Sequence, residues 1–147
     1  MIFIMHDNKA FTQVNQLSPL VLAFIGDSVF DLFIRSRLVM RKSVSAHKMH
    51  IKATGYVKAA AQSRIALSLH DKLNEEEKLV FRRGRNAKSA TVPKNADIMD
   101  YRHSTAIEAV IGYLYLSGKE ERLMELLEMA AEVIEMEGKE KDEHKKE

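Results

Sequence analysis

Two acidic residues lie inside strongly apolar stretches of the chain, where charged side chains are uncommon. Asp27 falls within residues 20–34 and Glu108 within residues 105–112. A buried carboxylate costs free energy unless a cation or dense hydrogen bonding compensates its charge. We therefore predict that Asp27 and Glu108 are buried between packed helices and together bind Mg²⁺, a cation that prefers oxygen ligands and retains several waters. Such a metal activates water and stabilises charge on a phosphodiester.

The pattern leaves open a simpler explanation, in which each acid caps a helix or forms a local salt bridge. Asp31 follows Asp27 by one helical turn and could lie behind it in a metal site. It also precedes Arg35 by four residues, the spacing of an ion pair along a helix, and this local role is the favoured one for Asp31. Glycines beside Asp27 and after Glu108, namely Gly26 and Gly112, would let two helices approach closely.

A second candidate site is a basic segment, residues 82–95, which contains no acid. Arginine guanidinium groups, lysines and small polar donors are suited to binding phosphate groups without contacting the bases. A solvated basic surface is the alternative. Because no aromatic residue is interleaved, a duplex backbone is a better ligand than stacked single-stranded bases. The residues predicted to contact phosphates of the ligand are Arg82, Arg83, Arg85, Asn86, Lys88, Ser89 and Lys94.

The elements that must position these residues are predicted to be helices. Ser18 and Pro19 open a helix to about residue 41, so apolar that we expect it to be the central one. Further helices are expected over about 45–69, from Asn74 into the basic segment, over 96–117 before Gly118, and over 119–137. No strand is convincing. The sequence predicts one all-α domain over residues 1–137 and a charged, frayed tail over 138–147.

Composition narrows the protein class. The 147 residues include no cysteine, which excludes disulfides and thiolate metal sites and fits a reducing, cytoplasmic compartment. The longest apolar run, residues 17–34, is interrupted by polar residues, so we expect a core helix and no membrane span. The start of the chain lacks the features of a signal peptide. His47 and His50 have a spacing that could share a metal, but exposed helix positions explain them as well.

Two segments and their order resemble the ribonuclease III family. Residues 24–31, Phe-Ile-Gly-Asp-Ser-Val-Phe-Asp, look like its signature, and residues 105–112, Thr-Ala-Ile-Glu-Ala-Val-Ile-Gly, look like its second catalytic segment. With residues 83–89 between them, the chain resembles Mini-ribonuclease III, the short bacterial form without a double-stranded-RNA-binding domain. The similarity spans about residues 17–127. Asp27 and Glu108 match family acids, whereas Ala23 and Thr105 stand where the full-length enzymes have two more.

The resemblance implies a domain of about five to seven helices that forms a homodimer. It implies Mg²⁺-dependent cleavage of double-stranded RNA, leaving 5′-phosphate and 3′-hydroxyl ends, with Asp27 and Glu108 as catalytic and metal-binding residues. It also implies maturation of precursor large-subunit (23S) ribosomal RNA and, as a partner, a large-subunit ribosomal protein. One alternative is a non-catalytic RNA-binding dimer that has lost acids. A helical nucleotide pyrophosphohydrolase is more distant, because the acids at 75–77 are explained by a helix start.

Overall fold

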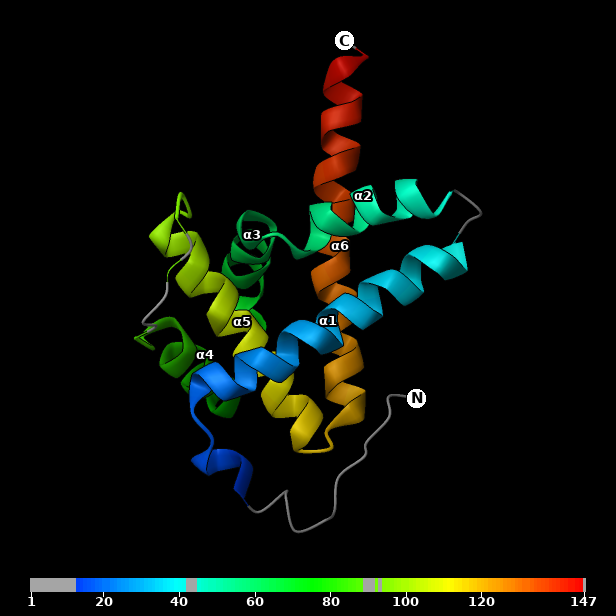
Figure 1. Cartoon of the computed structure of the whole chain (residues 1–147). Helices are drawn as coiled ribbons and strands as arrows, with labels where there is room; N and C mark the ends of the chain where they lie inside the picture. The colour runs from blue at the N-terminus through cyan, green and yellow to red at the C-terminus, as the bar shows by residue number, and fades with distance from the viewer. Residues whose placement is uncertain (1–12, 42–44, 89–91, 93, 147) are drawn as a thin grey trace.

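The computed structural model describes residues 13–41, 45–88, 92 and 94–146. These residues form six α-helices and contain no strand, which confirms the all-α prediction (Figure 1). A short 3₁₀ turn, His70–Lys72, precedes the fourth helix. The helices are α1 Pro19–Arg41, α2 Ala46–Val57, α3 Ala59–Leu69, α4 Glu75–Arg85, α5 Ile98–Leu116 and α6 Glu120–Lys145.

The central helix is α5 rather than α1, contrary to expectation. α1 crosses α5, while α3, α4 and α6 pack around it (Figure 1). α5 is buried on all sides from Ser104 to Leu114 except at Glu108. α1 instead buries one face and leaves Phe24 80% exposed. The two helices have similarly apolar sequences, so residue type alone could not distinguish the surrounded helix from the one with a free apolar face.

Two glycines bring α1 and α5 into backbone contact. A Cβ atom on Gly26 would overlap the carbonyl oxygen of Glu108, and one on Gly112 would overlap the carbonyl oxygen of Leu22. Only a residue without a side chain fits at either position. The expected close approach of the two helices is therefore confirmed, and it places Asp27 next to the turn of α5 that contains Glu108.

The helix expected over residues 45–69 is wrong, because the chain breaks at Lys58. The backbone of Lys58 is extended, with φ −63° and ψ 152°, and it separates α2 from α3. No proline marks this position, and the three alanines that follow it favour helix. The break redirects α3 onto α5, so tertiary packing overrides local propensity here.

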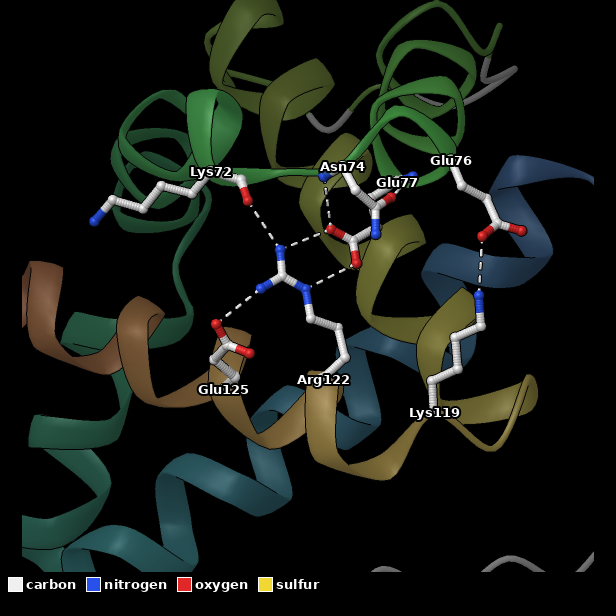
Figure 2. Close-up of polar contacts among 7 residues, drawn as sticks. All are labelled: Lys72, Asn74, Glu76, Glu77, Lys119, Arg122 and Glu125. Carbon is white, nitrogen blue, oxygen red and sulfur yellow. Dashed lines mark hydrogen bonds and ion pairs between the residues drawn. The ribbon is translucent and has the colours of Figure 1, made fainter.

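The start of α4 is as predicted and is tied to α6. Asn74 and Glu77 form a reciprocal capping box. Figure 2 shows Arg122 of α6 reaching this turn, with its guanidinium 2.8 Å from Glu77 Oε1 and 2.9 Å from the Lys72 carbonyl oxygen. Burial alone would raise the pKa of Glu77, but the bonds from Arg122 and Asn74 lower it overall. Glu77 is thus held as a charged, fully paired buried acid.

The last helix is longer than predicted. α6 was expected to end near Glu137, before a frayed tail, but it continues to Lys145. Gly138 lies in open space, where an added Cβ would meet nothing within 4 Å. The extension is exposed and rich in glutamate and lysine, residues that favour helix without tertiary contacts. The end of the last helix was therefore placed too early, and the boundary of the folded domain at residue 137 stays a prediction.

Candidate active site

Asp27 and Glu108 line the same cleft, although 80 residues lie between them in the sequence. The cleft has a volume of about 370 Å³ and lies between the first half of α1 and the first half of α5. Its lining includes Ala23, Asp27 and Ser28 from α1, and Tyr101, Ser104, Thr105 and Glu108 from α5. The structure therefore brings together the two acids that the sequence singled out. Ala23 and Thr105, the two positions at which the resemblance to full-length ribonuclease III would place further acids, line the same cleft.

The two acids differ in burial. Glu108 is half-buried at the contact between α1 and α5. Asp27 is exposed, so the expectation that it is a buried carboxylate is wrong. Asp27 lies at the edge of the exposed face of α1, and its apolar sequence neighbours belong largely to other faces of that helix. The cleft therefore has an inner acid and an outer one.

The electrostatics of the cleft disfavour two negative charges in the absence of a cation. Burial and the charge of Asp27 raise the pKa of Glu108 to about 8, and a hydrogen bond from Gln62 opposes them. Partial burial, followed by the charge of Asp31, raises the pKa of Asp27 above its ordinary value. Two carboxylates with raised pKa values in one cleft are typical of a functional site.

The donor set fits a hard cation that keeps part of its water shell. Two carboxylates face one cleft, and hydroxyl groups of Ser28 and Thr105 line it. Within the described residues no cluster of three or more acidic, histidine or cysteine side chains is suited to holding a metal. A metal bound by Asp27 and Glu108 would therefore complete its coordination with water or substrate oxygens, as Mg²⁺ commonly does.

Sequence reasoning missed three residues around the cleft. Tyr101 and Ser104 fall two turns and one turn before Glu108 on the same side of α5. Gln62 lies outside the cleft lining, is 2% exposed and acts on Glu108. Gln62 could have been found, because it occupies an apolar position of α3 in register with Ile65 and Leu69.

Other sequence-predicted residues are accounted for locally. Asp31 forms the expected ion pair with Arg35, with Oδ2 3.0 Å from Nε. His47 and His50 are exposed on α2, and the part of the chain that the structure describes contains no metal-ligand cluster to which they could belong.

The basic segment begins on the last turn of α4. Arg82 and Arg83 are exposed and Arg85 is half-buried, with Arg85 Nε 3.3 Å from the Asn86 side-chain oxygen. A Cβ atom on Gly84 would come within 2.9 Å of Ala106 Cα and 3.2 Å of the Thr105 carbonyl oxygen. The end of α4 therefore packs on the turn of α5 that leads to Glu108. Lys88 and Lys94 are exposed further along, and Ser89 lies outside the described residues.

One face of α1 beside the cleft is apolar and uncovered. Val21 is 48% exposed, Phe24 80% and Leu32 56%. These residues share one side of the helix, and Asp27 lies at its edge. A contiguous apolar patch on an isolated subunit is typical of a protein interface.

Comparisons with known proteins match most of the chain. A family model for the ribonuclease III domain matches residues 20–119, which include both acids and α4. Mini-ribonuclease 3 of Thermoanaerobacter sp. is 49% identical over 122 residues, covering 83% of this chain and 86% of that protein. Mini-ribonuclease 3 of Staphylococcus aureus is 40% identical, covering 87% of this chain and 97% of that protein.

A solved structure has the same fold. A crystal structure of a Fusobacterium nucleatum protein superposes with a TM-score of 0.73 at 31% identity, covering 82% of this chain and 96% of that one. Within the described residues, no helix has the length and apolarity needed to cross a membrane. On the family model and the relatives together, the chain is an endoribonuclease that belongs to the ribonuclease III family, among its Mini-ribonuclease 3 members.

Proposed function

We propose that this endoribonuclease cleaves double-stranded RNA with Mg²⁺ held by Asp27 and Glu108. The observation that carries the proposal is the cleft lined by these two acids from distant segments, in which the pKa of each carboxyl group is raised. A divalent cation offsets that cost, because it favours the ionised form of both groups. Mg²⁺ bound there would activate a water and stabilise charge developing on the scissile phosphate.

The chain's own residues supply geometry and electrostatics. The backbone contact at Gly26 fixes the offset between Asp27 and Glu108, so both carboxylates face the cleft before substrate binds. Glu108 lies on the half-buried inner side, and Asp27 on the open side where a phosphodiester can approach. Because Ala23 and Thr105 add no charge, these two acids provide the protein's negative charge at the site.

The basic segment supports a duplex substrate. Exposed arginines and lysines on and after α4 lie on the element that packs behind the Glu108 turn, and they can contact phosphates without reading sequence. Double-stranded RNA is recognised mainly by shape, backbone and 2′-hydroxyl contacts. The proposed RNA contacts remain Arg82, Arg83, Arg85, Asn86, Lys88, Ser89 and Lys94.

We further propose a homodimer that pairs the exposed apolar faces of α1. Val21, Phe24 and Leu32 would be buried in a self-complementary contact, as expected for a two-fold interface. Because Asp27 lies at the edge of this face, the second subunit would come close to the cleft. Two clefts brought together this way could each cut one strand of a duplex.

The proposed biological substrate is precursor 23S ribosomal RNA in the cytoplasm, with a large-subunit ribosomal protein as partner. This part of the proposal rests on the family resemblance. The cleft and the basic segment support a duplex ligand but contain no feature that identifies one particular RNA.

The decisive experiment replaces Asp27 by Asn. Asp27→Asn keeps the size of the side chain and removes its charge, so we expect a folded dimer that binds an RNA duplex and does not cleave it in Mg²⁺. Full cleavage by this variant would contradict the assignment. The competing function is a non-catalytic RNA-binding dimer, and it predicts that the unaltered protein binds the same duplex without cutting it at any Mg²⁺ concentration.

A further inference from the structure

Two hydroxyl side chains, Ser104 and Thr105, are buried on α5 about one turn before Glu108. Ser104 is 5% exposed and Thr105 is 7% exposed. Every other buried residue of α5 is apolar, aromatic or glycine. Burying a hydroxyl group costs free energy unless its hydrogen-bonding capacity is used. Alanine and valine would pack at these positions without that cost, so the presence of two hydroxyl groups here requires an explanation.

Both hydroxyl residues line the cleft that Asp27 and Glu108 share. They precede Glu108 by four and three positions, so all three residues lie on one face of α5. Helical side chains lean toward the N-terminus of their helix, and the Glu108 side chain therefore extends over the turn that contains Ser104 and Thr105. The buried hydroxyl groups of serine and threonine on α5 are thus concentrated at the wall of the cleft.

The single hydrogen of each hydroxyl group is directed to the helix backbone. Ser104 Oγ donates to the Tyr101 carbonyl oxygen at 2.8 Å, and Thr105 Oγ1 donates to the same oxygen at 2.9 Å. A hydroxyl oxygen that donates its hydrogen still has lone pairs with which it accepts. Ser104 and Thr105 therefore offer acceptors to a molecule in the cleft, and they have no hydrogen left to donate to a phosphate oxygen.

The ligand that suits two buried acceptors is a small hydrogen-bond donor. A water molecule bound to a divalent cation is such a donor, because its oxygen faces the metal and its hydrogens point away. Mg²⁺ retains several waters where the protein supplies only one or two carboxylates, as Asp27 and Glu108 do in this cleft. The 2′-hydroxyl of RNA also donates, but it is part of a duplex that is too large to reach side chains this deeply buried.

We propose that Ser104 and Thr105 are positioning residues whose hydroxyl oxygens accept hydrogen bonds from waters on the metal at Asp27 and Glu108. The inference rests on the proposed function, because it concerns the metal of that site. Neutral acceptors orient such waters without adding a third negative charge to a cleft in which the pKa of both carboxyl groups is already raised. Residues that support a metal through hydrogen bonds commonly contribute about 10- to 100-fold to its affinity.

The test measures Mn²⁺ binding by electron paramagnetic resonance, with no RNA present. Thr105→Val keeps the shape of the side chain and removes its hydroxyl group, so we expect the Mn²⁺ dissociation constant to rise about ten-fold. Ser104→Ala should change the affinity in the same direction. Thr105→Ser retains the hydroxyl group and should bind Mn²⁺ as the unaltered protein does. Unchanged affinity in both Thr105→Val and Ser104→Ala would overturn the inference.

Thr54→Val is the matched control for the loss of a threonine hydroxyl group. Thr54 Oγ1 donates to the His50 carbonyl oxygen at 3.0 Å, the same bond across one helical turn that Thr105 makes. Thr54 lies on α2, whereas the described residues that line the cleft belong to α1 and α5. Thr54→Val should leave Mn²⁺ affinity unchanged. An equal loss of affinity in Thr54→Val and Thr105→Val would contradict a role of Thr105 at the metal.

The outcomes separate this inference from the proposed function. If Thr105→Val binds Mn²⁺ normally and only its cleavage of RNA falls, the hydroxyl group serves the substrate and the inference is wrong. If the unaltered protein binds Mn²⁺ and both hydroxyl variants bind it equally well, the proposed metal site stands and only the inference fails. If the unaltered protein binds no Mn²⁺, the proposed function fails together with the inference.

A measurement on the unaltered protein covers the case in which Thr105→Val does not fold. Bound Mn²⁺ is paramagnetic and broadens the nuclear magnetic resonance signals of nearby atoms. The methyl signal of Thr105 should broaden as Mn²⁺ is added, and the methyl signal of Thr54 should stay sharp. A sharp Thr105 signal at Mn²⁺ saturation would show that Thr105 does not lie beside the metal, and the inference would be refuted.

Discussion

Replacing Glu108 by Gln should stabilise the metal-free protein, and more so as the pH rises. In the folded chain the pKa of Glu108 is raised to about 8 from an ordinary value of 4.5, by burial and by Asp27. A carboxyl group with a higher pKa in the folded state takes up a proton on folding, so stability falls as pH rises between these two values. Each unit of difference corresponds to about 1.4 kcal/mol, which sets an upper limit of about 5 kcal/mol.

The cleft is open to water, which screens the two acids. We therefore expect the unaltered protein to lose about 2 kcal/mol of unfolding free energy between pH 5 and pH 8, less than this limit. That loss corresponds to a shift of about 1 M in the urea midpoint, since unfolding of small domains has a slope of about 1–3 kcal/mol per M. The assay is urea unfolding in EDTA at several values between pH 5 and pH 8. The measured quantity is the difference between Glu108→Gln and the unaltered protein, because other acids also titrate in this range.

Glu121→Gln, a charge loss on the exposed surface of α6, is the control. It should give a difference that does not change with pH. Mg²⁺ should reverse the sign of the effect, because it binds the ionised carboxylates and stabilises only the protein that retains both of them. A difference for Glu108→Gln that is flat from pH 5 to pH 8 would refute the placement of Glu108 beside Asp27.

Three other variants test separate parts of the structure. The double variant Arg83→Ala, Lys88→Ala should bind an RNA duplex more weakly, and the slope of its log binding constant against log salt concentration should fall by about one unit per lost phosphate contact. An unchanged slope in filter binding would show that other residues contact the phosphates. Gly26→Ala should cost about 3 kcal/mol in urea unfolding through backbone overlap, whereas Gly55→Ala, which meets nothing within 4 Å, should be neutral or stabilising. Phe24→Lys should yield monomers in sedimentation, and a persistent dimer would place the interface on another surface.

The sequence singled out two acids that line one cleft, but it did not predict how exposed each of them is. Asp27 and Glu108 could be chosen because acids inside apolar helices are rare, and Gly26 and Gly112 indicated where two helices would touch. These inferences depend on residue type and spacing, which are visible in one chain. The exposure of Asp27 was missed, because a helix that is apolar on nearly every side gives no sign of which face remains uncovered.

The sequence by itself determined that the protein is all-α, where α1 and α4 begin, and which two acids are unusual for the apolar segments that hold them. Those properties follow from capping residues, helical periodicity and the energetic cost of isolated charge. Only the tertiary structure decided that α5 is central, that the chain breaks at Lys58, and that Asp27 and Glu108 line one cleft. Each of these depends on contacts between segments far apart in the chain, and local propensity carries no information about such contacts.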